Sequence, residues 1–188
     1  MQNYLAVLTI VLMIAMVMAR VAIMKKRGIE TVHFGKLDKT DFLIPPFAIF
    51  YFYLVFAAAF HLPAPSTQEF FPFELIAWIG VALCLAGLLI LLWSLVSFGQ
   101  SFRIGIDTTR PDQLITSGIF ACSRNPIYTA FAMILLGQFL IFSNWILLVY
   151  AFAAFWLFHR QVLREEDFLK EHYGEAFTAY CQNVRRYL

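Results

Sequence analysis

Charged residues are scarce in this sequence. Asp, Glu, Lys and Arg make up only 14% of its 188 residues, whereas 61% are hydrophobic. This composition excludes an ordinary soluble domain, because a soluble domain of this length cannot bury so much apolar surface in its core. Several apolar stretches approach the roughly 20 residues that a helix needs to cross about 30 Å of hydrocarbon. The sequence therefore predicts a protein embedded in a membrane.

The alternation of apolar and polar residues that a membrane β-barrel requires is also missing. The segment 83–96, for example, is apolar on every face. In lipid, a helix satisfies its backbone hydrogen bonds internally, whereas an open strand does not. The predicted fold class is therefore all-α: a polytopic membrane protein with five transmembrane helices and a cytoplasmic amphipathic helix after them.

Motifs of several other protein classes are absent as well. The three cysteines lack the paired spacing of a zinc site or a disulfide framework, so we expect free thiols and no metal. There is no Walker A sequence, no G-x-G-x-x-G after a strand, and no Ser or Cys with an evident base. The net charge of +2 is too small to indicate a nucleic-acid partner.

Five apolar segments of helix length are separated by turn signals or basic clusters. They are Tyr4–Met24, Phe42–Leu62, Phe73–Phe98, Pro126–Phe142 and Trp145–Leu163. The first has no basic region before it and no cleavage site after it, so we expect it to be retained as a signal anchor. Only Ser143 and Asn144 divide the last two, which predicts a helical hairpin whose first turn suits Pro126.

Lys and Arg are confined to alternate loops. All 14 lie between residues 20 and 39, between 103 and 124, or from residue 160 onward. Since short cytoplasmic loops carry the excess of positive charge, this distribution predicts an N-terminus outside and a C-terminus in the cytosol. Arg20 is the exception within the first span, near its cytoplasmic end, where a long side chain reaches the interface.

Beyond residue 163 the chain keeps a helical pattern. Apolar residues recur at steps of three and four, namely Phe168, Leu169, Tyr173, Phe177, Tyr180 and Val184. Such an amphipathic helix lies in the membrane interface or packs under the spans. Gly174 is expected to interrupt it.

Polar residues accumulate in only two segments, 99–128 and 159–167. The predicted topology places both at the cytoplasmic face of the bilayer. Any ligand site is therefore expected there.

The first of these segments ends where a loop becomes a helix, in the sequence Arg124-Asn125-Pro126 followed by Tyr128. Exposed backbone N–H groups and the positive end of the helix can receive an anionic group at such a place. The alternative is structural: Arg124 follows the distribution of positive charge, Asn125 caps the helix, and Tyr128 belongs to an interfacial aromatic belt.

The second segment combines basic and acidic side chains. Arg160 and Arg164 are one helical turn apart, as are Gln161 and Glu165, so one helix face can present guanidinium and carboxylate groups together. The acids Glu165, Glu166 and Asp167 either bind an ammonium group or ribose hydroxyls, or form a solvated helix end. His159 by itself is more typical of an interfacial histidine than of a catalyst.

Two further residues, in the connection between the third and fourth spans, are candidates for a structural or functional role. Gly118 indicates a turn or a close backbone approach. Arg103 either holds a substrate anion or serves the distribution of positive charge.

Three groups of residues, taken in order and spacing, resemble the isoprenylcysteine carboxyl methyltransferase family. They are Leu114–Phe120, Ser123–Tyr128, and Glu165-Glu166 followed by Tyr173, Gly174 and Tyr180. The resemblance covers roughly 99–186, and the wider group is similar also to phospholipid N-methyltransferases. The sequence departs at Asn125, where the better-known members have His, so an imidazole role in chemistry would be lost here while backbone contacts would remain.

The resemblance implies S-adenosylmethionine bound at the cytoplasmic face, and a lipophilic or membrane-delivered acceptor among the membrane lipids. The implied cofactor-binding residues are Leu114, Ile115, Gly118, Arg124, Asn125, Pro126, Tyr128, Glu165 and Glu166. Candidates to hold the acceptor or take its proton are Arg103, Arg160, Arg164 and Glu165. The single membrane domain would then consist of a three-span region, 1–98, and a methyltransferase region, 99–188.

Two other functions are compatible with the same sequence. A more distant similarity in the C-terminal region allows a sterol-reductase-like enzyme that uses a reduced nicotinamide. A transporter or a non-catalytic scaffold is the third alternative, although the charged residues cluster at one face instead of mid-bilayer and no internal repeat is evident.

Overall fold

The computed structural model describes residues 1–28, 44–63, 70, 73–99 and 114–188. Within these ranges the regular structure is helical, as predicted, and the sole β-type pairing is an isolated bridge between Ser123 and Arg185. The elements are α1 (Gln2–Lys26), α2 (Ile44–Phe60), α3 (Glu74–Ser97), the short 3-10 helix η3 (Gly118–Ala121), α4 (Pro126–Phe142), α5 (Trp145–Tyr173) and α6 (Glu175–Asn183).

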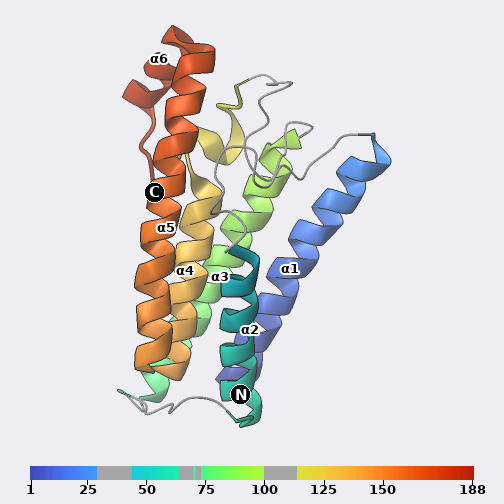
Figure 1. Cartoon of the computed structure of the whole chain (residues 1–188), viewed down its shortest axis with the longest axis vertical. Coiled ribbons are helices and arrows are strands. Elements are labelled where there is room, and N and C mark those ends of the chain that lie inside the picture. The colour runs from blue at the N-terminus through green and yellow to red at the C-terminus, as the bar shows by residue number, and fades with distance from the viewer. Residues whose placement is uncertain (29–43, 64–69, 71–72, 100–113) are drawn as a thin grey trace.

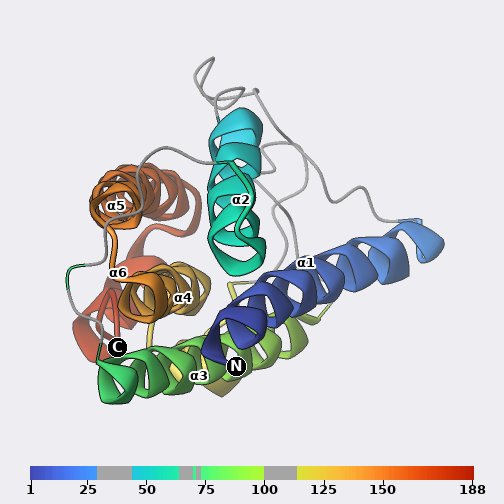
Figure 2. The same cartoon turned by 90° about the horizontal axis from the view of Figure 1, so that it is seen from below.

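The helices α1 to α5 lie along the long axis of the molecule and alternate in direction (Figure 1). The pair α3–α4 has the most extensive contact, α5 packs on α4, and α1 packs on α3. Viewed along the bundle, α2 lies between α1 and α5 and contacts both (Figure 2). The end of α1, the element η3, the start of α4 and the outer part of α5 are all at the same end of the bundle (Figure 1).

Small residues allow α3 and α4 to approach closely. A Cβ atom added at Gly80 would lie 2.6 Å from the carbonyl oxygen of Gly137, and one at Gly87 would lie 2.9 Å from the carbonyl oxygen of Ala130. Membrane helices use such positions because their association depends on close van der Waals contact. The glycines therefore set the spacing of the central pair.

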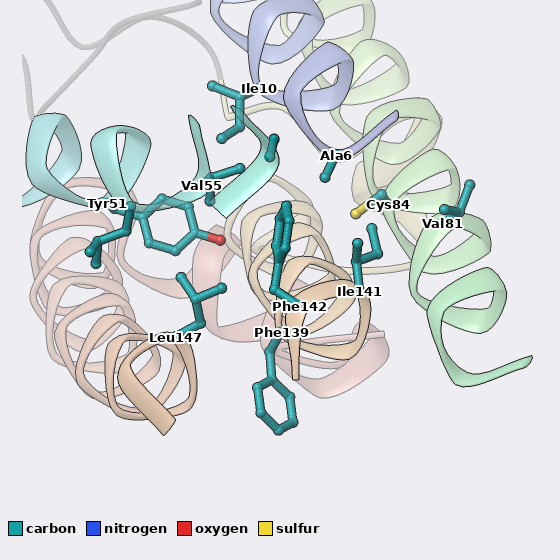
Figure 3. Packing of buried hydrophobic residues seen from close by; sticks show 12 residues of the cluster. Ala6, Ile10, Tyr51, Val55, Val81, Cys84, Phe139, Ile141, Phe142 and Leu147 are labelled. Atoms are coloured by element: carbon teal, nitrogen blue, oxygen red, sulfur yellow. The ribbon is translucent and has the colours of Figure 1, made fainter. Parts of the chain in front are cut away.

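At the end near the N-terminus, the buried core joins all five long helices. Figure 3 shows side chains of α1, α2, α3, α4 and α5 meeting there, among them Tyr51, Cys84, Phe142 and Leu147. A polar contact crosses the same region, since Nε2 of Gln138 donates a 2.8 Å hydrogen bond to the carbonyl oxygen of Ala6.

The predicted hairpin is confirmed. Helix α4 ends at Phe142, Ser143 adopts a left-handed conformation with φ of 48°, and α5 begins at Trp145. Asn144 caps α5, because its side-chain oxygen accepts a 2.9 Å hydrogen bond from the backbone N–H of Leu147. Cys84, Cys122 and Cys181 are free thiols, also as predicted.

Helix α5 extends beyond the predicted span 145–163, as the helical pattern after residue 163 indicated. It continues without a break to Tyr173, because the polar residues after Leu163 keep the helical spacing and have good helix propensity. Gly174, with φ of 54°, then separates α5 from α6, as expected from the sequence.

Three helices, α1, α3 and α5, are long and apolar enough to cross a membrane. The apolar helices α2 and α4 are shorter, at 17 residues each. Arg20 of α1 donates a hydrogen bond to the carbonyl oxygen of Gly99, beyond the end of α3. Of the basic residues on which the predicted orientation depends, Lys36, Lys39, Arg103 and Arg110 lie outside the described ranges.

Candidate functional site

The two polar segments predicted to converge do meet, at the end of the bundle where α4 begins. Arg124 forms a two-point ion pair with Glu166 of α5: Nε lies 3.0 Å from Oε1 and Nη2 lies 3.3 Å from Oε2. The side chains of Arg124 and Glu166 are only 11% and 10% exposed. Because this geometry matches the guanidinium fork to the carboxylate, the pair fixes α5 against the start of α4.

The same arginine also holds the C-terminal segment. Its Nη1 donates to the carbonyl oxygens of Cys181, at 3.1 Å, and Val184, at 2.7 Å. The backbone N–H of Arg124 donates to the carbonyl oxygen of Arg185 at 2.9 Å. All three guanidinium nitrogens therefore have partners within the protein.

Asn125 is the N-cap residue of α4, but its side chain does not cap the helix. Instead, Nδ2 donates to Oε1 of Glu166 at 3.0 Å and to the carbonyl oxygen of Arg186 at 3.3 Å. Pro126, at the first position of α4, is buried, as the missing N–H allows. Asn125 thus belongs to the Arg124–Glu166 cluster.

Arg186 completes this cluster from the tail. Its Nε lies 2.9 Å and its Nη2 2.8 Å from Oε2 of Glu166. Burial alone would raise the pKa of the Glu166 carboxyl, but hydrogen bonds from Arg186 and Arg124 outweigh it, and the pKa is lowered. The hydrogen bond to Glu166 correspondingly raises the pKa of Arg186.

The neighbouring acid, Glu165, has different partners. Its Oε1 accepts a 2.6 Å hydrogen bond from the hydroxyl of Tyr128 and a 3.1 Å bond from Nε2 of Gln161. The ring of Tyr128 lies 5.7 Å from that of Phe158. Glu165 and Tyr128 are half-buried, whereas Glu166 is buried. The two adjacent acids thus have distinct surroundings, one in an ion-pair cluster and one beside aromatic rings.

Arg160 and Arg164 lie one turn apart on α5, as predicted. The guanidinium of half-buried Arg160 is 5.4 Å from the ring centre of Trp156, and Arg164 is exposed. Arg103 lies outside the described residues, so its place at the site stays a prediction.

Gly118 has the structural role that its position suggested. Its φ is 64°, and a Cβ there would overlap the hydroxyl of Ser97 at the end of α3. The N–H of Ile119 donates to the same hydroxyl, at 3.4 Å. Leu114 and Ile115 are half-buried just before this turn. Contact of these residues with a cofactor remains a prediction.

The sequence interpretation named Tyr180 only as part of the family resemblance and did not place Arg186 or Tyr187 at this site. Besides Arg186, the hydroxyl of Tyr187 lies 2.9 Å from Nδ1 of His159, and the hydroxyl of Tyr180 donates a 2.6 Å bond to the carbonyl oxygen of Phe120. Burial raises the pKa of Tyr180 to about 12. The position of Arg186 and Tyr187 directly after an amphipathic helix was an available signal. It was not used, because the basic residues of the tail were interpreted only as part of the charge distribution that sets the topology.

The fold and this region define a class: an apolar, all-helical protein with an ionic and aromatic cluster at one end of its bundle. Residues 75–176, more than half of the chain, match the family model described as phospholipid methyltransferase. The chain belongs to this family of membrane methyltransferases, which confirms the resemblance seen in the sequence.

Among curated proteins, the chain is 27% identical over 123 residues to a probable protein-S-isoprenylcysteine O-methyltransferase of Oryza sativa subsp. japonica, covering 64% of this chain and 63% of that protein. It is 25% identical over 108 residues to protein-S-isoprenylcysteine O-methyltransferase B of Arabidopsis thaliana, covering 56% and 55%. The matched region thus spans less than two thirds of these relatives' length.

Proposed function

We propose that the chain is an integral membrane methyltransferase that uses S-adenosylmethionine and methylates a lipophilic or membrane-delivered acceptor. Family membership supports the reaction class. The observation that carries the proposal is that Tyr128 at the start of α4 and the pair Glu165-Glu166 of α5 lie together at one end of an apolar bundle. A small ligand can contact both segments only because they share this place.

The proposed topology has five spans, with the N-terminus outside and the ligand site and C-terminus in the cytosol. Support comes from the last turn of α1, which carries Lys25 and Lys26 and lies at the same end of the bundle as the start of α4 (Figure 1). Arg124, which precedes α4, and Arg186 both bind Glu166 there. Two of the five proposed spans, α2 and α4, are short and fit a thin or locally thinned bilayer.

The chemistry of the side chains at this end fits the methyl donor. Its ammonium group requires an acid, its carboxylate a helix N-terminus or a guanidinium, and its sulfonium an aromatic face. Glu165, the first turn of α4 with Arg160, and the rings of Tyr128 and Phe158 have these properties.

We assign Arg124, Asn125 and Glu166 a different task from Glu165. Because these three bond one another and the tail, they hold α4, α5 and the C-terminal segment together and shape the site. Glu165 and Tyr128 are then the side chains that contact the donor directly. Leu114, Ile115 and Gly118 line the approach from η3 in this proposal.

S-adenosylmethionine supplies a methyl group on a positively charged sulfur, so its carbon is already activated for displacement. The protein therefore needs mainly to align donor and acceptor and to exclude water. Arg160 and Arg164, with Arg103, hold an anionic acceptor such as a carboxylate or thiolate. For an amine acceptor, Glu165 takes the proton.

The names of the relatives suggest an acceptor class, isoprenylcysteine, which combines a lipid chain with a carboxylate. We propose an acceptor of this kind, or a lipid thiol or amine, that enters from the bilayer. The region 99–188 would then provide the donor site, and 1–98 would help to enclose the apolar part of the acceptor.

Calorimetric titration of the purified protein with S-adenosylmethionine tests the donor. We expect saturable binding that Glu165→Gln weakens at least about tenfold, the scale of one lost charge-assisted contact. Asp167→Asn is the matched control, since Asp167 is an exposed acid on the same helix. Saturable binding of NADPH with none of S-adenosylmethionine would instead support the reductase alternative and overturn the proposal.

Incubation with host membranes and a donor carrying a labelled methyl group identifies the acceptor. Mass spectrometry of the extracted lipids and lipidated peptides should show a labelled product that the Glu165→Gln variant forms more slowly. Labelled water-soluble products alone would contradict a membrane-delivered acceptor.

A further inference from the structure

The last five residues, 184–188, follow α6 and return along α5 toward the bundle (Figure 1). They lie beyond the region 75–176 that matches the family model. Val184 is extended, with φ of −126° and ψ of 134°, and Arg185 forms a parallel bridge with Ser123. We call this stretch the C-terminal strap.

The strap is attached on two sides. On the α4 side, the backbone N–H groups of Arg124 and Asn125 donate to the carbonyl oxygens of Arg185, at 2.9 Å, and Arg186, at 3.2 Å. On the α5 side, the side chains of Arg186 and Tyr187 contact Glu166 and His159, two turns apart on the same helix face. The strap therefore joins the two helices that carry the proposed donor site.

Arg186 has the closest contacts with one oxygen of Glu166. Oε2 lies 2.9 Å from Nε and 2.8 Å from Nη2 of Arg186, but 3.3 Å from Nη2 of Arg124. Oε1 is shared by Arg124 and Asn125, each at 3.0 Å. Without Arg186, Oε2 keeps only the longer bond to Arg124, and the carboxylate has no second guanidinium to fix its plane.

We propose that Arg186 is a positioning residue of the methyl-donor site, acting through Glu166. It fixes the orientation of Glu166 and so the relative placement of α4 and α5, which sets where Tyr128 and Glu165 meet the donor. The strap thereby contributes to the geometry of the site. This inference rests on the proposed function.

The neighbouring arginine provides a matched control. Arg185 is exposed and contributes its backbone carbonyl to the strap, whereas Arg186 contributes its side chain. Arg185→Ala and Arg186→Ala change the net charge equally. We compare both with Arg186→Lys, which keeps the charge and loses the planar fork.

Calorimetry of variants of the 188-residue chain in detergent, with S-adenosylmethionine as the probe, measures the dissociation constant of the folded protein. We expect Arg186→Ala to raise it by about tenfold to a hundredfold, the range found at metal sites when a group that orients a ligating side chain is removed. Arg186→Lys should give an intermediate value, and Arg185→Ala should match the wild type. Melting temperatures are recorded in parallel.

A lower melting temperature with an unchanged dissociation constant in Arg186→Ala would mean a merely structural role and would overturn the inference. If Arg186→Ala does not fold, the comparison moves to Arg186→Lys and Tyr187→Phe, and unchanged binding in both would overturn it equally. Wild-type protein that fails to bind the donor would refute the proposed function itself. Wild-type binding with an Arg186→Ala variant that binds equally well would refute only the inference.

Discussion

The hydroxyl of Tyr128 donates a 2.6 Å hydrogen bond to Oε1 of Glu165 and so connects the first turn of α4 to α5. The two residues are far apart in the sequence, and each lies beside an aromatic or amide neighbour that limits its movement. This bond orients the carboxylate that we assign to the ammonium group of the donor.

Tyr128→Phe removes the hydroxyl and keeps the ring contact with Phe158. Because the acceptor of this hydrogen bond is a carboxylate, we expect its loss to cost about 1.5 to 3 kcal/mol in total. Part of this cost lowers the free energy of unfolding, and the rest weakens the binding of the donor. Thermal melting with and without S-adenosylmethionine measures both. Tyr4→Phe, at an exposed position at the other end of the bundle, should change neither. Equal behaviour of the two variants would contradict the assigned role.

Glu166→Gln should destabilise the protein strongly at neutral pH, by about 3 kcal/mol, since it leaves Arg124, whose side chain is only 11% exposed, without its counter-charge. The variant also tests a pH dependence. The folded-state pKa of Glu166 lies below its ordinary value of 4.5, so its stabilising effect is complete above that value and is lost as the pH falls toward the folded-state pKa.

Melting temperatures measured from about pH 7 to pH 3 should therefore show the wild type and Glu166→Gln converging at the acid end. A difference between them that stays constant over the whole range would show that the carboxylate charge of Glu166 does not contribute.

Gly80→Ala adds a methyl group that would meet the backbone of Gly137. The helices α3 and α4 must then separate, at a cost of about 1 to 3 kcal/mol, as for other overpacked interiors. Resistance to unfolding in a graded series of denaturing detergent measures the effect. Ala82→Val enlarges an exposed side chain on the same helix and should be tolerated.

The proposed orientation is testable with the native thiols, because Cys122 is exposed near the start of α4 whereas Cys84 is buried. A membrane-impermeant maleimide should label Cys122 only after the cells are permeabilised. In a Cys122→Ser background, the variant Trp145→Cys, at an exposed position at the opposite end of the bundle, should be labelled in intact cells. The reverse labelling pattern would show that the protein has the opposite orientation in the membrane.

Sequence reasoning located the helices well where strong periodicity and sharp boundaries coincide. Pro126 and the Ser143-Asn144 break correctly predicted where α4 begins and ends, and Gly174 correctly predicted the boundary between α5 and α6. The helical pattern after residue 163 also predicted that the chain stays helical up to Gly174, although hydropathy alone marks only where a segment leaves lipid and not where its backbone hydrogen bonding ends.

The meeting of Arg124 with Glu166 was anticipated from topology, since both segments were predicted at one face. The partners of each side chain were not. Nothing in spacing distinguishes Glu165 from Glu166, and only the rotation of α5 against α4 turns one toward Tyr128 and the other toward the tail. Arg186 was assigned to charge distribution for the same reason, because a loop arginine has no periodicity that indicates its partner.

Helix α5 has 29 residues without interruption, a length of about 43 Å at 1.5 Å per residue. A rigid rod of this length transmits a change of tilt from one end to the other. If lipids of different thickness alter the inclination of its apolar half, the outer half that carries Glu165 and Glu166 must swing in proportion. We therefore expect the thickness of the surrounding bilayer to affect the position of the ionic cluster through the tilt of α5.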